Sequence, residues 1–524
     1  MIPSKFLYIY RFDQNGSLQV YTRGATFQGF THLINGEGYI FVTSEDEANV
    51  CDGTIGTTTS TLPPTIVGAT KLGDDIDGEA PNDFSGGSVS LSDDGSRVAI
   101  GALKNDGAGA NAGHVRIYDW SGSAWTQVGD DIDGENRDNS GSSVSLSADG
   151  SRVAIGAMLH DGDGNHTEND GNGDYTGCAR IYEWSGSAWI QLGSDIDGEA
   201  AGDQAGRSIS LNDDGSIVAI GSPFNDGNGE TSGHVRIFHW NGSSWNQLGS
   251  DIDGEAAGDW NGWSVSLSGN GNTVAISALV NDGSGQNAGH ARIYSFDSSG
   301  WNQLGSDIDI AGSYNSGRSI SLSNDGSRFA LSINILSASQ NVIGVYEWSG
   351  SAWIQVGSNI SVNNQLEFNT NNSWSVSLSS DGNRVAMLSL AHNDYAGIVN
   401  IFDWSGSAWT QVVGGIEGEA AGDHTGGSSS NLSLSGDGNR VAIGAPANDG
   451  GGYRSGHVRV YQLDAAAPTT TTTSTTTTTL APRTSSAFYE QVGSNGCSGG
   501  SLNEYPRNTN CVETASNEII FDEE

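Results

Sequence analysis

Aspartate and glutamate recur at a fixed spacing along this chain, and carboxylates this close together can bind a divalent cation. The phrase Asp-Ile-Asp-Gly-Glu occupies residues 131–135 and has near-copies elsewhere. Calcium takes six to eight oxygen ligands, so acids from neighbouring repeats would have to cooperate to hold it. The candidate calcium ligands are Asp75, Asp77, Glu79, Asp131, Asp133, Glu135, Asp195, Asp197, Glu199, Asp251, Asp253 and Glu255.

The same acidic loops have two other interpretations. A face rich in carboxylates could dock a cationic partner. The simplest interpretation is that aspartate and glycine form tight loops, that Asp77 and its equivalents cap local turns, and that the charge keeps the particle soluble. Two later copies, at residues 307–317 and 359–373, lack most of the acids.

The composition excludes two classes of partner. The 524 residues include 62 Asp and Glu but only 21 Lys and Arg, which gives a formal net charge of −41. A chain this acidic is a poor ligand for nucleic acid or for an anionic membrane surface. No stretch approaches the ~18–20 apolar residues of a membrane-spanning helix, so no membrane insertion is expected. Periodic tryptophans, tyrosines and phenylalanines argue against disorder.

The N-terminus and the cysteines give two further expectations. Residues 1–20 have one lysine and only a short apolar run, which is a poor secretory signal, so we expect a chain that is not exported by that route or is already mature. The cysteines are Cys51, Cys178, Cys497 and Cys511, and no pair has CxxC spacing, so no zinc site is expected. The last two could close a loop near the C-terminus.

A repeat organises most of the chain. Its anchor is a short apolar run, Ser-x-Asp-Gly or a close variant, and a second apolar run, as in SVSLSDDGSRVAIG at residues 88–101. The anchor recurs every 55 or 56 residues, except for one step of 65 that contains an insertion at His160–Gly177. The seven turn glycines are Gly95, Gly150, Gly215, Gly271, Gly326, Gly382 and Gly438. Seven copies of one supersecondary unit are therefore expected.

Each copy contains four strand signals, which in the second copy lie at residues 125–129, 143–147, 152–156 and 178–184. Within a set, hairpins and Gly-rich loops join the strands, so each set forms an antiparallel four-stranded sheet. Only the connection from 129 to 143 is long and must cross to the next sheet. Seven such sheets predict an all-β, seven-bladed β-propeller, with the Ser-rich strands innermost.

The ends of the repeat region predict how the ring closes. The seventh copy ends at residues 457–463 without an outer strand, and the missing strand signal lies at residues 65–73. The N-terminal strand should therefore become the outer strand of the last blade. The alternative, an open seven-unit solenoid, would leave two exposed sheet edges, which β-proteins avoid.

Tryptophans flank the predicted hairpins at the outer edge of the blades, for example Trp120 and Trp125. We expect their rings to pack between neighbouring blades, because most copies carry the pair and one copy replaces a tryptophan with Phe296. An aromatic platform for carbohydrate is the alternative.

The repeat pattern G-x-S-V-x-L-S-x-D-G-x-x-V-A-I-G-A-P, followed by G-x-V-x-V-Y, resembles the FG-GAP repeat of integrin α-subunit heads and of many surface proteins. The last copy keeps Gly444-Ala445-Pro446, and the resemblance covers roughly residues 65–464. It implies a seven-bladed propeller used for adhesion and binding. The family's calcium site is not carried over, because the turns between the second and third strand signals of each copy are bare Asp-Gly or Asn-Gly here, with too few oxygen ligands.

No constellation specific to one copy suggests catalysis, so we expect a protein that is not an enzyme. No nucleophile elbow, phosphate-binding loop or HExxH motif is present. The histidines and arginines that recur share repeat positions, which indicates packing or hydrogen bonding. They are His114, His234, His290 and His457, and Arg97, Arg152, Arg328, Arg384 and Arg440.

The regions outside the repeats complete the expected domain organisation. Residues 1–50 should form a small β domain, with a hairpin around Asn15-Gly16, that could anchor the chain. The remaining segments are a Thr/Pro linker at 51–64, the propeller at 65–464, a Thr-rich linker at 465–487 and an acidic tail at 488–524.

A small N-terminal domain, a linker, a propeller, a second linker and a tail are the parts expected of a protein that displays a binding module on a particle. With its acidity and lack of a signal peptide, the chain resembles appendage or decoration proteins of marine cyanobacterial viruses. The resemblance implies a virion-surface protein whose terminal segments contact other virion proteins and whose propeller binds a host-surface glycan or protein. The alternative is a secreted or cell-surface, calcium-dependent adhesin or lectin of a marine microbe.

Overall fold

The structure is a computed structural model that describes residues 6–12, 18–22, 39–43, 66–161, 175–310, 312–335, 340–361, 374–390, 392–423, 431–465, 511–513 and 519–521. The chain divides into two units, Leu62–Thr469 and a second unit formed by Met1–Thr61 with Thr470–Glu524. Within the described residues, no helix has the length and apolar composition needed to span a bilayer.

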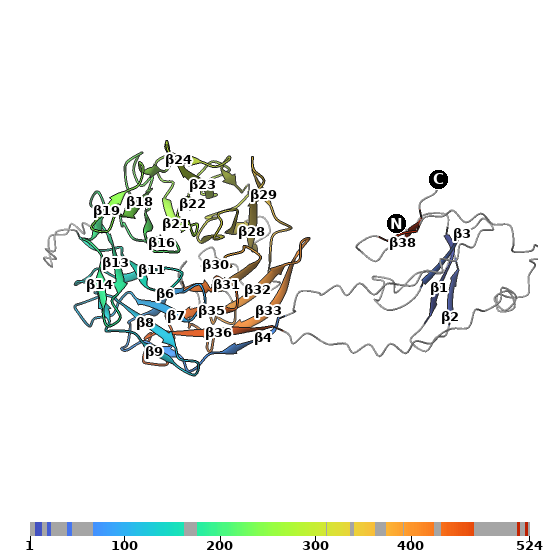
Figure 1. Cartoon of the computed structure of the whole chain (residues 1–524), viewed down its shortest axis with the longest axis horizontal. Coiled ribbons are helices and arrows are strands. Elements are labelled where there is room, and N and C mark those ends of the chain that lie inside the picture. Colours follow the sequence, from blue (N-terminus) through green and yellow to red (C-terminus); the bar gives the residue numbers. More distant parts are fainter. Residues whose placement is uncertain are drawn as a thin grey trace, which may run out of the picture. The chain divides into compact units, whose positions relative to one another are not determined.

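The larger unit is a ring of seven antiparallel sheets, which confirms the expected seven-bladed β-propeller (Figure 1). Blade one contains β6 (Ser85–Leu91), β7 (Arg97–Ala102), β8 (His114–Trp120), β9 (Trp125–Gln127) and β10 (Ile132–Asp133). Blade two contains β11 (Ser140–Leu146), β12 (Arg152–Ala157), β13 (Cys178–Trp184), β14 (Trp189–Gln191) and β15 (Ile196–Asp197). Blade three contains β16 (Ser208–Leu211), β17 (Ile217–Ser222), β18 (His234–Trp240), β19 (Trp245–Gln247) and β20 (Ile252–Asp253).

The other four blades repeat the same order. Blade four contains β21 (Asn261–Leu267), β22 (Thr273–Ala278), β23 (His290–Asp297), β24 (Gly300–Gln303) and β25 (Ile308–Asp309). Blade five contains β26 (Ile320–Leu322), β27 (Arg328–Ile335), β28 (Gln340–Trp348) and β29 (Trp353–Gln355). Blade six contains β30 (Trp374–Leu378), β31 (Arg384–Ser389), β32 (Ile398–Trp404) and β33 (Trp409–Glu417). Blade seven contains β34 (Leu432–Leu434), β35 (Arg440–Ala445), β36 (His457–Ala465), β4 (Ile66–Lys71) and β5 (Ile76–Asp77).

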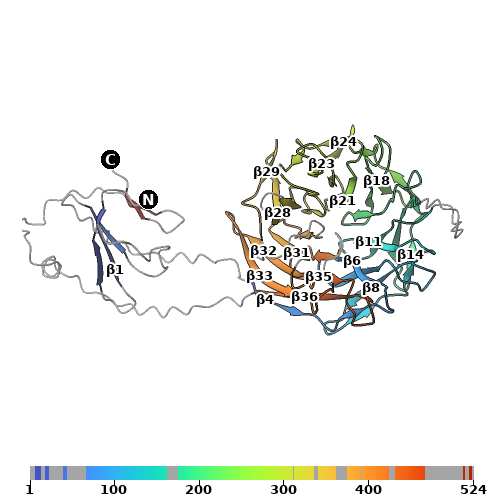
Figure 2. The ribbon, with the colours of Figure 1, turned by 180° about the vertical axis from the view of Figure 1, so that it is seen from behind.

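The ring closes through a strand from the far end of the sequence. Strand β4 pairs antiparallel with β36, with Ala69 opposite Leu463 and Lys71 opposite Tyr461. Figures 1 and 2 both show β4 beside β36 at the outer edge of the last blade. The predicted closure is therefore confirmed, and the open solenoid is excluded.

Five blades contain a short strand within the segment predicted to be a loop crossover. In blade one, Ile132 and Asp133 pair with Val115 and His114 after the outer strand has ended. Gly129 separates the two parts with a φ of 77°, and a side chain there would lie 2.9 Å from the Trp184 ring. The chain leaves the sheet at this glycine and returns because the following isoleucine is buried between blades.

Apolar contacts between neighbouring blades form the core. In one such cluster, Ala99 and Ile117 of blade one pack against Val144 and Ile155 of blade two. The tryptophan pairs close the outer edge of these interfaces, as expected for packing. Trp120 and Trp125 have ring centroids 5.3 Å apart, and Trp125 Nε1 donates a 2.9 Å hydrogen bond to the Leu72 carbonyl of the neighbouring blade.

Serine hydroxyls satisfy the free edge of each innermost strand. Ser90 Oγ accepts a 3.0 Å hydrogen bond from Leu146 N of the next blade, and Leu91 N donates in turn to Ser433 Oγ. The same contact joins all seven blades, through Ser90, Ser145, Ser210, Ser266, Ser321, Ser377 and Ser433. Buried N–H groups without partners are costly, which explains the recurring Ser-Leu pair in the innermost strands.

Glycine is required where blades approach most closely. A Cβ at Gly156 would lie 1.9 Å from the Gly206 carbonyl oxygen of the next blade and 2.4 Å from Ser143 Oγ. Gly206 contributes backbone just before β16 and Ser143 lies in β11, so neither can move away cheaply. Gly156 thus sets how tightly blades two and three meet.

We expect Gly156→Ala to lower the free energy of unfolding by about 3 kcal/mol, since overpacking against backbone leaves no low-cost relief. The measurement is equilibrium denaturation in urea followed by tryptophan fluorescence. The control is Gly68→Ala, because Gly68 also lies in a strand but has no atom within 4 Å of its Cβ position. Equal stability of the two variants would contradict the proposed packing constraint.

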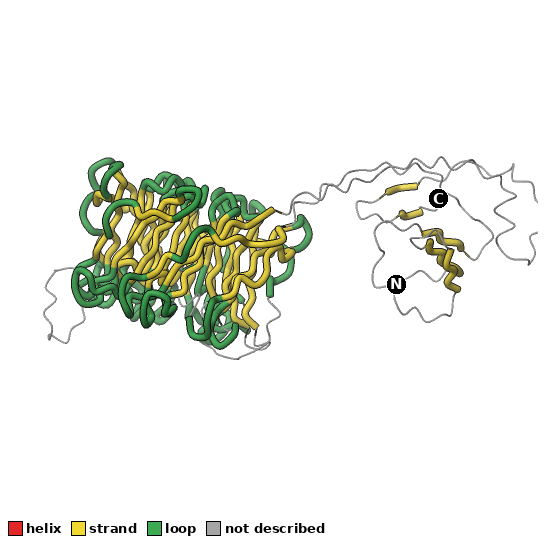
Figure 3. The backbone as a smooth tube through the Cα atoms, turned by 90° about the horizontal axis from the view of Figure 1, so that it is seen from below, coloured by secondary structure: helices red, strands yellow, loops and turns green. Residues whose placement is uncertain are grey.

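The crossovers between blades and the loops after the second strand of each blade lie on the same face of the propeller. Figure 3 shows the strands between two layers of loops. On one face, Asn105 Nδ2 donates a 3.1 Å hydrogen bond to Asp83 Oδ2, which joins the loop after β7 to the crossover between blades. The acidic crossovers and the loops that carry Asn-Asp-Gly, at residues 105–107, 225–227, 281–283 and 448–450, therefore share this face, which we call the loop face.

The smaller unit contains two sheets among its described residues. Strand β1 (Phe6–Phe12) pairs with β2 (Leu18–Thr22), as the expected hairpin requires, and also with β3 (Tyr39–Thr43). In the tail, β37 (Cys511–Glu513) pairs with β38 (Ile519–Phe521). The predicted turn at Asn15-Gly16, the linker at 51–64 and Cys497 lie outside the described residues.

Candidate functional sites

The first aspartate of each acidic loop is fixed within its own blade. Asp131 Oδ1 accepts a 2.6 Å hydrogen bond from Gln127 Nε2, and Asp131 Oδ2 lies 3.6 Å from His114 Nδ1. Asp195 and Asp251 have the same glutamine contact. Asp75, which has no such glutamine, instead accepts hydrogen bonds from Lys71 and Arg459. The carboxylates of Asp131 and Asp75 thus lie beside the first residue of the third strand of their blades, His114 of β8 and His457 of β36.

The glutamate of each loop reaches the next blade. Glu79 Oε1 lies 3.6 Å from Arg116 Nη1 of blade one. The equivalent pairs are Glu135 with Arg180, Glu199 with Arg236, Glu255 with Arg292, and Glu419 with Arg459. Each acidic loop therefore contributes its first aspartate to its own blade and its glutamate to the next blade. The group of acids in each blade comes from two consecutive loops.

The second aspartate of each acidic loop forms its main contacts through backbone groups. Asp77, Asp133, Asp197 and Asp253 occupy the short strands and pair with the first residue of the third strand. The carbonyl oxygen of Asp77 accepts a 2.6 Å hydrogen bond from Arg116 Nη2. Their side chains are largely exposed. The partial burial of the Asp133 carboxyl and the negative charge of Asp131 raise the pKa of Asp133.

Different aspartates cap the turns of the crossovers. Asp83 is 2% exposed, and its Oδ2 accepts hydrogen bonds from Ala80 N at 2.9 Å and from Asn105. Its equivalents are Asp138, Asp203, Asp259 and Asp423. The expectation that Asp77 and its equivalents cap local turns was wrong in its choice of residue, because Asp77 continues the sheet. An Asx cap needs a side chain directed back into the turn.

The predicted calcium ligands are thus brought together in groups, but each group includes an arginine. A guanidinium lies within 4 Å of the crossover glutamate in blades one, two, three, four and seven. These arginines partly neutralise the carboxylates from which a calcium ion would gain its affinity. Calcium binding stays a prediction at these positions.

Buried histidines lie beside the same groups. His114, His234 and His290 are each 1% exposed, and the Nε2 atom of each has no hydrogen-bond partner among the described residues. Burial, reinforced by the charge of the neighbouring arginine, lowers the pKa of each to about 4. They are neutral at pH 7.

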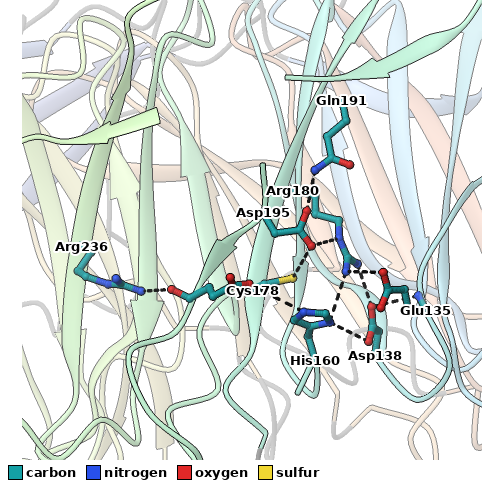
Figure 4. Close-up of polar contacts among 9 residues, drawn as sticks. Glu135, Asp138, His160, Cys178, Arg180, Gln191, Asp195 and Arg236 are labelled. Carbon is teal, nitrogen blue, oxygen red and sulfur yellow. Dashed lines mark hydrogen bonds and ion pairs between the residues drawn. The ribbon is translucent and has the colours of Figure 1, made fainter. Parts of the chain in front are cut away.

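Blade two departs from this pattern (Figure 4). Cys178 stands where blades one, three, four and seven have histidine, and His160 stands where they have asparagine. His160 Nδ1 lies 3.1 Å from Asp138 Oδ1, and Arg180 bridges Asp138 and Asp195 at 2.8 and 2.7 Å. The thiol of Cys178 is buried, which raises its pKa.

A second site, which the sequence analysis missed, lies on the loop face where the innermost strands begin. Arg207 lies 4.0 Å above the Trp263 ring, and Trp263 stacks on Trp260 with a centroid distance of 5.5 Å. Phe224 meets Trp260 edge to face. Arg318 adds a second positive charge that acts on Arg207. We call these five residues the axial cluster.

The axial cluster is confined to part of the ring. Blades one and two have Gly87 and Ser142 where blades three and four have Arg207 and Trp263. Since blades three and five are not adjacent, Arg207 and Arg318 interact across the space near the propeller axis. The signal in the sequence was the replacement of small residues by arginine and tryptophan at this one position.

No protein-family model matches the chain, and no curated protein matches it. Similar solved structures include Kuenenia stuttgartiensis hydrazine synthase, with 12% identity, a TM-score of 0.46, and coverage of 79% of this chain and 99% of that chain. The β-propeller domain of Myceliophteria thermophila Cps50 (Swd1) has 11% identity, a TM-score of 0.45, and coverage of 75% and 99%. The Pseudomonas aeruginosa periplasmic gluconolactonase PpgL has 13% identity, a TM-score of 0.41, and coverage of 67% and 93%. These likenesses are too distant to indicate a function, and the propeller assignment depends on the strand pairing described above.

Proposed function

We propose that this chain is a non-enzymatic attachment protein whose propeller binds an acidic glycan at the axial cluster. The single observation that carries this proposal is the pair Arg207 and Arg318. Within the described part of the chain, neither arginine forms an ion pair with a carboxylate, although acids outnumber basic residues 62 to 21. Two unpaired guanidinium groups in so acidic a protein favour an anionic ligand.

The electrostatics of the axial cluster support this ligand class. Burial, with the charge of Arg318, lowers the pKa of Arg207 to about 10. The protein therefore bears a cost for keeping the two like charges together and away from water. A bound carboxylate would offset that cost, because guanidinium groups bind carboxylates with two parallel hydrogen bonds.

The aromatic residues support a sugar as the carrier of the anionic group. Trp260 and Trp263 are half-buried and stack on one another, so part of their ring surface stays accessible. Tryptophan rings suit ligands that have an apolar surface and a polar rim, since the ring is large, rigid and amphipathic. A uronic or sialic acid combines such a surface with a carboxylate.

The setting that we propose is the surface of a virion. The Thr-rich segments on both sides of the propeller suit a displayed module, with the terminal segments contacting other virion proteins. A secreted or cell-surface adhesin is the alternative, and O-linked glycan mass on the purified native protein would favour it. The acidic glycan site is independent of this choice.

Glycan binding is tested by comparing acidic and neutral oligosaccharides of equal length on immobilised full-length protein. We expect binding of uronic or sialic acid oligosaccharides and a loss of at least about tenfold in affinity, or about 1.4 kcal/mol, for Arg207→Gln and for Arg318→Gln. The matched control is Arg137→Gln, because Arg137 is an exposed arginine on a crossover of the same face.

Two results would overturn the proposal. One is the absence of binding to any acidic glycan. The other is an equal loss of affinity in all three arginine variants, which would indicate a general charge effect. Thermal unfolding of each variant shows whether its fold is intact.

A further inference from the structure

We propose that blade two binds one divalent transition metal ion of the zinc class. The ligands are His160 Nε2, Cys178 Sγ and one carboxylate oxygen each from Asp195 and Asp197. This site is separate from the axial cluster and does not depend on the proposed glycan binding.

The donor atoms already lie close together. One nitrogen of His160, the thiol of Cys178 and an oxygen of each aspartate are all within 4.8 Å of one another. Tetrahedral zinc has bonds of about 2.0 to 2.3 Å, which places its ligands roughly 3.3 to 3.8 Å apart. Side-chain shifts of about 1 Å would complete the site, and neither the strands nor the crossover would have to move.

The orientation of His160 leaves Nε2 available as the nitrogen that binds the metal ion. Nδ1 lies 3.1 Å from Asp138 Oδ1, and because a carboxylate only accepts hydrogen bonds, this contact places the proton on Nδ1. Arg180 Nη2 lies farther from Nδ1, at 3.3 Å. Nε2 faces Asp197 Oδ1 at 3.9 Å, too far for a hydrogen bond. A carboxylate that orients a ligating histidine in this way is common in metal sites.

Charge also favours a cation here. The carboxylates of Glu135, Asp138 and Asp195 all lie within 4 Å of the single guanidinium of Arg180. Asp197 adds a fourth carboxylate beside His160. The cluster therefore has more negative than positive charge before a metal binds. On binding, the thiol proton of Cys178 passes to solvent and a sulfur–metal bond replaces the S–H bond.

Among the residues that the structure describes, this ligand set occurs in blade two only. The other acid-rich blades have asparagine at the position of His160, namely Asn105, Asn225, Asn281 and Asn448. They have histidine at the position of Cys178. The two exchanges nearly conserve the combined side-chain volume, so the packing is kept, while an imidazole and a thiol replace an amide and an imidazole. A thiolate selects zinc over calcium. CxxC spacing does not reveal this site because its ligands come from three separate segments.

The test uses cobalt as a spectroscopic probe for zinc. The full-length chain carries Cys51→Ser, Cys497→Ser and Cys511→Ser, so that Cys178 is the single thiol. We expect one Co²⁺ per chain with a thiolate-to-cobalt charge-transfer band in the near ultraviolet, which Zn²⁺ displaces and Ca²⁺ does not. His160→Asn and Cys178→Ser should each abolish the band.

The matched control is His234→Asn, because His234 occupies the position of Cys178 in blade three. It should keep both the band and the stoichiometry. The proposal is overturned if the charge-transfer band is absent, if Ca²⁺ competes as well as Zn²⁺, or if His160→Asn leaves binding unchanged. His160→Asn restores the residue of the other blades, so an intact fold is expected and is checked by thermal unfolding.

Discussion

Removal of residues 1–73 will open the ring, whereas removal of residues 1–61 will leave it closed. The longer deletion removes β4, the outer strand of blade seven, and spares every other strand of the propeller. We expect the longer deletion to lower the free energy of unfolding by on the order of 5 kcal/mol, or to leave the protein aggregated. The shorter deletion should unfold like the full chain.

The reason is that β4 is needed by two blades. Its hydrogen bonds to β36 satisfy one edge of blade seven, with Leu463 opposite Ala69. Leu72, directly after β4, packs into the core between blades seven and one, and its carbonyl accepts the indole hydrogen bond of Trp125. Each apolar side chain that loses its burial costs about 1.5 to 3 kcal/mol, and the exposed strand edges promote aggregation.

Size-exclusion chromatography and thermal unfolding of the two deletion variants check this prediction. A sharp monomer peak and an unchanged melting temperature after removal of residues 1–73 would contradict the role of β4 in closure. The shorter deletion is the control for any contribution of the small N-terminal unit.

Acidification from about pH 6.5 to pH 4 will destabilise the propeller strongly, because three buried histidines resist protonation. In the folded protein, burial lowers the pKa of His114, His234 and His290 to about 4. In the unfolded chain a histidine has a pKa of about 6.5. Between these values the unfolded chain binds protons that the folded chain does not, so the free energy of unfolding falls as the pH falls.

The size of this effect follows from the shift. One pKa unit corresponds to about 1.4 kcal/mol, so each histidine contributes on the order of 2 to 3 kcal/mol, which is lost by pH 4. Below pH 4 a second group acts in the same direction. The Arg459 guanidinium and Lys71 hold the pKa of Asp75 well below its usual range despite its burial, and protonation of this carboxylate weakens the pairs that join β5 to β36.

Urea denaturation at half-unit steps from pH 8 to pH 4 measures this slope. The triple variant His114→Gln/His234→Gln/His290→Gln should have a much shallower slope between pH 6.5 and pH 4. His239→Gln should keep the slope of the full chain, because His239 is exposed. A slope that the triple variant shares with the full chain would assign acid sensitivity to other groups.

Much of the fold was predictable because it depends on local signals. The Asp-Gly turns, the alternation in SVSLS and the lengths of the connections together define the blades, and the leftover strand at 65–73 predicted closure. The short strand at Ile132–Asp133 was missed, because two residues after a glycine carry too little periodicity to be recognised. Its pairing depends on the neighbouring strand β8.

The sites were predictable only in part. The sequence shows that the acidic loops recur, but their carboxylates are divided between two neighbouring blades, and the arginine that meets each glutamate lies far along the chain, as for Glu79 and Arg116. The axial cluster combines Arg207, Trp263 and Arg318 from three blades, so no linear pattern contains it.

By itself, then, the sequence determined the all-β class, seven blades, the order of the strands and the excess of acid, because each of these follows from the spacing and type of nearby residues. The tertiary structure alone decided which side chains meet. The curvature of the ring lets the charges of Arg207 and Arg318 interact, and it places the glutamate of each acidic loop beside an arginine of the next blade. Within blade two, the loop after β12 brings His160 beside Cys178 at the start of β13. A repeated motif is the same in every copy, so it cannot show which side chains of different blades meet. Those contacts depend on how the ring closes.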